Sequence, residues 1–127
     1  MQSQKQKSLE RLQKLYKNLD TGMTRAKYLE MCEQLNKEPR DDEIPPDWED
    51  FPDIVHDAIN TFNSLGDRVY PDIGFMGKDY TNLPYFTAMY NIIDTEFFLE
   101  ILSWLDSRAI KRSQDQLKRE HDKLKRK

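Results

Sequence analysis

The stretch from Asp94 to Lys127 constrains the fold most, because it is the longest periodic segment of the chain. Its first half carries apolar residues at helical spacing, and these define one wide face: Phe97, Phe98, Ile101, Leu102 and Leu105. The pattern predicts a single helix that begins apolar and ends as a basic, solvated rod. At about 1.5 Å per residue, this helix is roughly 50 Å long. It extends beyond so small a domain unless another segment covers it.

After Ser107, large apolar residues recur only at every seventh position, at Ile110, Leu117 and Leu124. This spacing is half of a coiled-coil seam. We expect the stripe to serve self-association through a coiled-coil tail, or packing against the first helix. An alternative hypothesis is nucleic-acid binding, because the same segment is rich in basic residues. These basic residues include Lys111, Arg112, Lys118, Arg119, Lys123 and Arg126. The acidic residues between them, Asp115, Glu120 and Asp122, weaken the positive electrostatic potential of the segment.

Length and charge indicate one small domain rather than a disordered chain. With 127 residues, a single modest core is expected. Charged residues make up 34% of the chain, but the 11% of aromatic residues argues against full disorder. The net charge of −3 hides an acidic middle and two basic ends. The charge changes predict three parts: a basic N-terminal helix (1–20), a helical core domain (21–107) and a basic C-terminal helical extension (108–127).

Further helices are predicted at Ser3–Leu19, Thr24–Asn36, Pro52–Leu65 and Leu83–Asn91, from apolar spacing and from their capping and breaking residues. In the second of these, a buried stripe is expected at Tyr28, Met31, Cys32 and Leu35. Cys32 is the only cysteine of the chain, so no intrachain disulfide is predicted. We interpret it as a small core residue rather than a nucleophile.

The connector Lys37–Phe51 is acidic and rich in proline, which disfavours a regular helix. Ile44, Trp48 and Phe51 are interleaved with its carboxylates. This pattern suits docking on a basic, apolar groove of a partner. In the alternative interpretation, which is favoured, Trp48 folds back on the core of its own domain.

The segment Asp67–Thr81 is a second unusual connector, because loops of this length tend to be functional or disordered. Its aromatic residues Tyr70, Phe75 and Tyr80 argue against disorder, and we predict that they contact a partner. A short irregular hairpin around Gly74–Gly77 fits the glycine spacing. A nucleic-acid-binding Gly-x-x-Gly loop between two helices does not fit, since Pro71 precedes it and no helix follows directly.

No catalytic apparatus is recognisable. Two histidines and one cysteine, far apart in the sequence, leave no zinc pattern and no nucleophile–base pair. The acidic connector lacks the ligand spacing of a calcium loop. We therefore predict a protein that is not an enzyme and has no cofactor and no metal site. The polar first twenty residues and the absence of a stretch of ~20 apolar residues predict a cytoplasmic protein with no membrane partner.

The blocks "KYLEMCEQL", "EPRDDEIPPDWEDFP" and "SLGDRVYPDIGFMGKDY", followed by a helix ending in "SRAIKRSQDQLKREHDKLKRK", lie within residues 27–127. Over this range the chain resembles small proteins encoded by large tailed bacteriophages. The resemblance implies an assembly factor, a virion component, a packaging accessory or a modulator of host proteins. It implies a location in the host cytoplasm or the virion, and no role for any single residue.

Together these patterns predict an all-α fold of four to five helices with a long C-terminal helix, one acidic Pro-rich connector and one aromatic loop. The function they favour is a non-enzymatic protein–protein interaction module, as a phage assembly or structural accessory. Its partner would be a phage or host protein, or a second copy of the chain. Nucleic-acid binding in packaging, replication or transcription is the alternative.

Overall fold

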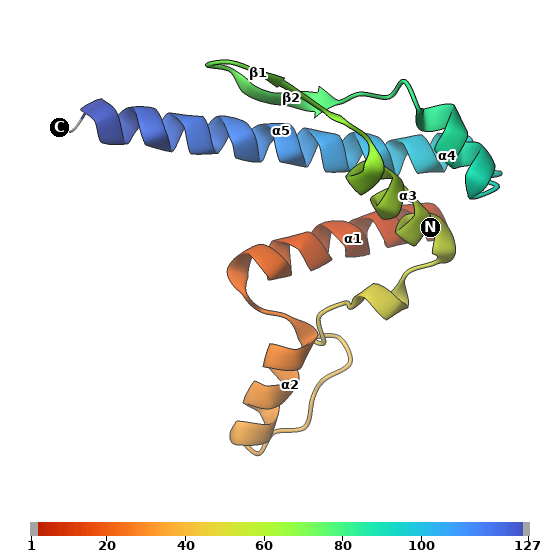
Figure 1. The fold of residues 1–127 in the computed structure, drawn as a ribbon. Helices are drawn as coiled ribbons and strands as arrows, with labels where there is room; N and C mark the ends of the chain where they lie inside the picture. Colours follow the sequence, from red (N-terminus) through yellow and green to blue (C-terminus); the bar gives the residue numbers. More distant parts are fainter. Residues whose placement is uncertain (1–2, 126–127) are drawn as a thin grey trace. The chain divides into compact units, whose positions relative to one another are not determined.

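The computed structural model describes residues 3–125, which form five α-helices, one short 3-10 helix and a two-stranded antiparallel sheet (Figure 1). The chain divides into two compact units, unit 1 (Met1–Pro52) and unit 2 (Asp53–Lys127). The three parts predicted from the sequence (1–20, 21–107 and 108–127) were defined by changes of charge, whereas these two units are defined by compactness. The three-part division therefore stays a prediction. Each unit is described by itself.

Unit 1 contains α1 (Gln4–Thr21), α2 (Arg25–Gln34) and the 3-10 helix η1 (Trp48–Asp50). A capping box starts α1, because the Ser3 hydroxyl accepts from the Gln6 backbone and the Gln6 side chain accepts from the Ser3 backbone. Gly22 ends α1 with a φ of 78°. The side chain of Thr24 caps α2, as expected. The first two predicted helices are therefore confirmed, with ends that differ by no more than a turn.

The predicted buried stripe of α2 is wrong in part. Cys32 is buried, whereas Met31 is 39% exposed and Leu35 is 69% exposed. Leu35 lies just past Gln34, the last residue of α2, and Asn36 then turns the chain with a φ of 54°. The position that was expected to extend the apolar face is thus no longer on a helix.

Unit 2 contains α3 (Asp53–Ser64), β1 (Asp67–Tyr70), β2 (Gly74–Lys78), α4 (Leu83–Met89) and α5 (Thr95–Lys125). The long C-terminal helix is confirmed, and all five residues of its predicted apolar face are buried. Helix α3 packs against α5 and buries Val55 and Ala58. No helix among residues 3–125 combines the length and the apolar character needed to cross a membrane.

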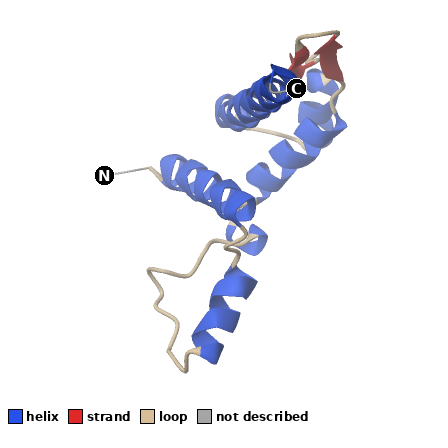
Figure 2. Cartoon of the chain, turned by 90° about the vertical axis from the view of Figure 1, so that its left-hand side faces the viewer, coloured by secondary structure: helices blue, strands red, loops and turns tan. Residues whose placement is uncertain are grey.

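The antiparallel pair β1–β2 departs from the predicted all-α class, although the hairpin suggested around Gly74–Gly77 is present. Val69 lies opposite Phe75, and Tyr70 lies opposite Gly74. The turn between them is closed by the Ile73 N–H, which donates to the Tyr70 carbonyl at 3.3 Å. An isolated two-stranded hairpin is marginal in water. Here β2 lies along α5, which supports the hairpin (Figures 1 and 2).

Candidate interaction surface

The outer edge of β2 is held by side chains of α5 rather than by a third strand. The Phe75 N–H donates to the Ser113 Oγ at 3.2 Å, and the Lys78 N–H donates to the Asp106 Oδ1 at 3.0 Å. An unpaired strand edge exposes backbone groups that must find other partners. Helix α5 supplies them on one edge of the hairpin, so the open edge is that of β1.

Two glycines allow β2 to approach α5 this closely. A β-carbon added to Gly74 would lie 2.9 Å from the Leu117 Cδ1, and one added to Gly77 would lie 3.1 Å from the Asp106 Oδ2. Both residues also have a positive φ, of 88° and 111°, which glycine adopts without steric cost. In this structure the Gly-x-x-Gly spacing serves close packing of a strand on a helix.

Asp106 also fixes the segment that follows β2. The Tyr80 hydroxyl donates to the Asp106 Oδ2 at 2.8 Å. Burial, together with this hydrogen bond and the nearby negative charge, raises the pKa of Tyr80 well above its ordinary value of 10.0. The phenol therefore stays protonated and continues to donate. One carboxylate thus joins β2 and Tyr80 to the middle of α5.

Lys78 anchors the end of β2 on the side of α3. Its ammonium donates to the Asp67 Oδ1 at 2.6 Å and to the Leu65 carbonyl at 3.3 Å, and it lies 4.6 Å from the centre of the Phe62 ring. Only 10% of its side chain is exposed. Among residues 3–125, no buried side-chain nitrogen or oxygen lacks a hydrogen-bond partner. The positive charge of Lys78 is therefore balanced within unit 2 by the carboxylate of Asp67.

Beside Asp106, an apolar groove of about 460 Å³ opens between α5 and the segment that leads into α4. It is lined by Tyr80, Leu83, Leu99, Leu102, Ser103, Asp106, Ser107 and Ile110. The groove brings together Tyr80, predicted as a partner contact, and Ile110, predicted for self-association. Asp106 is its only charged residue, and both carboxylate oxygens accept hydrogen bonds within unit 2.

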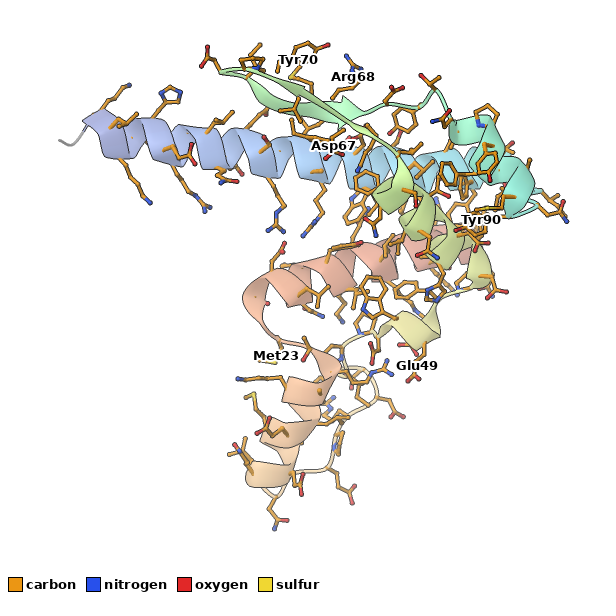
Figure 3. The ribbon with its side chains drawn as sticks, in the orientation of Figure 1. Met23, Glu49, Asp67, Arg68, Tyr70 and Tyr90 are labelled. Carbon is orange, nitrogen blue, oxygen red and sulfur yellow. The ribbon has the colours of Figure 1, made fainter. Side chains whose placement is uncertain are left out.

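The hairpin carries a set of exposed apolar side chains, called here the hairpin ridge: Val69 (65% exposed), Tyr70 (47%), Ile73 (55%) and Met76 (38%). Tyr70 was predicted as a partner contact, and Figure 3 labels it on the hairpin. Phe75, also predicted, is half-buried. Val69, Ile73 and Met76 were not predicted from the sequence. Their signal was the apolar residues on either side of the Pro71–Asp72 turn, with Val69 and Tyr70 before it and Ile73, Phe75 and Met76 after it.

The predicted contacts of the acidic connector lie in unit 1 and are less available. Phe51 is buried, with 6% exposed. Trp48 is 37% exposed and packs edge-on against Tyr16, with ring centres 5.9 Å apart. Ile44 is half-buried. Trp48 therefore does pack on its own unit, while Phe51 presents little surface to a partner.

Arg25 ties the connector to α2. Its guanidinium donates to the Pro45 carbonyl at 3.0 Å, to Glu49 at 3.1 Å and to Asp50. An open groove of about 550 Å³ lies here, with basic and acidic residues in equal number: Arg11, Lys14 and Arg25 with Asp41, Asp42 and Asp50. The acidic charge of the connector is thus partly balanced within unit 1.

The C-terminal stripe, which consists of Ile110, Leu117 and Leu124, has different surroundings at each residue. Ile110 lines the groove, Leu117 is half-buried beside Gly74, and Leu124 is 67% exposed. Lys111, Arg112, Lys118, Arg119 and Lys123 are exposed on α5, whereas Arg126 lies outside the described residues. No cluster of three or more potential metal ligands occurs within residues 3–125.

Comparisons of the chain with protein-family models, with curated proteins and with solved structures give no match. The surface described above is therefore interpreted from its own geometry.

Asp50→Asn is expected to make the stability of unit 1 less sensitive to acid. The Asp47 N–H lowers the pKa of Asp50 below its ordinary 3.8, partial burial opposes this, and the Arg25 guanidinium lowers the pKa further. The resulting stabilisation is present above pH 3.8 and is lost as the pH falls through the folded-state value. The measurement is thermal unfolding at about pH 7 and pH 3, followed by NMR signals of α1 and α2.

The control is Asp41→Asn, which removes one negative charge from the same connector. An equal pH dependence in the Asp50→Asn variant and in the wild type would contradict this role of Asp50.

Proposed function

We propose that the protein is a non-enzymatic protein–protein interaction module, and that the hairpin ridge and the adjoining groove form its contact surface. The observation that supports this most is the exposure of four large apolar side chains on the ridge, in a chain whose residues are 34% charged. Large apolar side chains that are left exposed together on one short segment of a small domain are typical of interaction sites.

The chemistry of this surface favours a protein partner over a charged ligand. Tyrosine, methionine and large aliphatic side chains are common in the buried centre of interfaces, where charged residues are depleted. The only carboxylate of the groove, that of Asp106, is engaged by Tyr80 and by the Lys78 backbone. A partner would therefore meet an apolar surface with little unbalanced charge.

As the biological setting we propose assembly or structural support in a tailed bacteriophage, in the host cytoplasm or the virion. The support for this setting is the sequence resemblance of residues 27–127. The long α5 also suits a structural accessory, because it presents one continuous element to neighbours in a larger assembly.

Val69→Lys combined with Ile73→Asp is expected to reduce partner capture about 10-fold, equivalent to ~1.4 kcal/mol. Both side chains are more than half exposed, so the changes remove apolar contact surface without opening the core. The measurement is capture by the tagged full chain from its native cellular context in the presence of nuclease, quantified by mass spectrometry.

Leu35→Asp is the matched control, because it changes an equally exposed apolar residue in unit 1. If the double variant retains the same nuclease-resistant partner as strongly as the wild type, the ridge is not the contact surface.

Nucleic-acid binding through α5 is the second candidate, and the arrangement of its basic residues favours it. Residues on a helix are separated by about 100°. Since Ser113 and Leu117 lie beside β2, Lys111, Lys118 and Arg119 project to the opposite side of α5. Asp115 and Asp122 share that side and reduce its positive field.

This candidate predicts that Lys118→Glu combined with Arg119→Glu weakens duplex DNA binding and lowers its salt dependence. For every phosphate that the variant no longer binds, the slope of log affinity against log salt should fall by about 0.9. Fluorescence anisotropy across a salt series measures both quantities, with Lys27→Glu combined with Lys37→Glu, both exposed in unit 1, as the charge-matched control. An unchanged slope would exclude this face of α5 as the nucleic-acid site.

A further inference from the structure

The hydrogen bonds of β2 show which backbone groups lie on the open edge of β1. In an antiparallel pair, two opposite residues either bond to each other through their backbone groups or direct these groups away from each other. Lys78 and Phe75 of β2 direct their N–H groups to side chains of α5. Asp67 and Val69, which lie opposite them, therefore direct their N–H and C=O groups to the outer side of β1.

Within the described part of unit 2, no other segment bonds to this edge. All four residues of β1 are exposed, and Figure 3 labels Asp67, Arg68 and Tyr70. Among residues 53–125, no hydrogen bond joins the backbone of Asp67 or Val69 to a group outside the hairpin. The bulge lies on β2, where two residues stand opposite Arg68 alone, so β1 itself is a regular strand. Such an edge is a template for a further strand.

The spacing of the outward groups specifies an extended backbone as the occupant. In a strand, every second residue directs its N–H and C=O groups to the same side, and Asp67 and Val69 are two residues apart. A helix does not match these groups, because its own backbone groups are bonded internally.

A second copy of β1 fits this edge poorly. A two-fold axis pairs two antiparallel strands about one residue, which then lies opposite itself. An axis at Asp67 sets two carboxylates side by side, and an axis at Arg68 does the same with two guanidinium groups, which destabilises a sheet. An axis at Val69 extends the pairing to Pro71, which lies in the turn and has no N–H.

We propose that β1 binds an extended segment of a partner protein, which adds to the hairpin as a third strand. In this mode of binding, main-chain hydrogen bonds give affinity and alternate side chains give specificity. Val69 and Tyr70 are exposed and point to opposite faces of β1, so the added strand meets an apolar side chain on each face. The inference rests on the proposed function, because it names how the hairpin ridge engages its partner.

The charge of the edge favours an acidic residue in the added strand. Arg68 is exposed and takes part in none of the ion pairs found among residues 53–125. The carboxylate of Asp67, in contrast, is already bound to Lys78. Opposite charges on neighbouring strands stabilise their pairing. We therefore expect an Asp or Glu beside Arg68, flanked by β-branched or aromatic residues.

The experiment selects binders to the purified full chain from a displayed library of random peptides of about 10 residues, the upper length of common strands. The affinity of a selected, synthesised peptide is measured by fluorescence anisotropy. Amide hydrogen exchange then locates it. The Asp67 and Val69 amides are expected to exchange rapidly in the free chain and slowly in the complex.

Val69→Pro removes an N–H that points away from β2, a change that edge strands tolerate. Val69→Thr is the matched control, since it keeps the N–H and the branched shape. The peptide is expected to bind Val69→Pro about 10-fold more weakly than Val69→Thr. Arg68→Glu should also weaken binding, most strongly at low salt.

Protection of the Lys78 amide checks that Val69→Pro keeps the hairpin, and if it does not, the exchange result for the wild type decides. The inference is overturned if no peptide is selected, or if the Asp67 and Val69 amides are already protected in the free chain. Equal affinity of a folded Val69→Pro and of Val69→Thr also overturns it.

These outcomes are separate from that of the proposed function. If capture of a partner is lost in the Val69→Lys and Ile73→Asp double variant but unchanged in Val69→Pro, the ridge stands and only strand addition is removed. If the double variant keeps its partner while a peptide protects the Asp67 and Val69 amides, the ridge is refuted as the contact surface and the edge of β1 is supported.

Discussion

The carboxylate of Asp106 makes the hydrogen bonds on which the proposed contact surface of unit 2 depends. It accepts hydrogen bonds from the Lys78 backbone and from the Tyr80 hydroxyl, and so fixes both β2 and the start of the segment leading to α4 on one helix. A two-stranded hairpin has little stability of its own. The hairpin ridge and the groove therefore exist as defined surfaces because α5 holds the segments that form them.

This arrangement changes which surfaces remain for partners. The C-terminal stripe begins inside unit 2, because Ile110 lines the groove and Leu117 lies beside Gly74. Only Leu124 of the stripe is largely exposed. Other large apolar side chains of unit 2 that are exposed include those of the hairpin ridge and, in and after α4, those of Tyr85, Met89 and Ile93. The contact surface proposed above therefore lies on the segments packed along the first half and middle of α5 rather than at its end.

The parts of the fold that depend on local signals could be predicted from the sequence, and the hairpin could be predicted only in part. The caps at Ser3 and Thr24 and the apolar face of α5 follow from spacing within a few residues. The hairpin is held by Ser113 and Asp106, which lie 38 and 28 residues from their partners in β2. No local pattern reveals such a support. Likewise, Tyr70 and Tyr80 were predicted as partner contacts, which stays a prediction, but Asp106, which positions Tyr80, was not singled out.

The most direct test of this support is amide hydrogen exchange at Phe75 and Lys78, compared between the wild type and Asp106→Ala. If Asp106 holds the hairpin, the variant loses protection at Lys78 and across β1 and β2, while amides of α3 around Val55 and Ala58 keep theirs. Asp115→Ala, on the opposite side of α5, should leave the hairpin protected. Unchanged protection of β1 and β2 in Asp106→Ala would contradict the claim that this carboxylate holds the hairpin on α5.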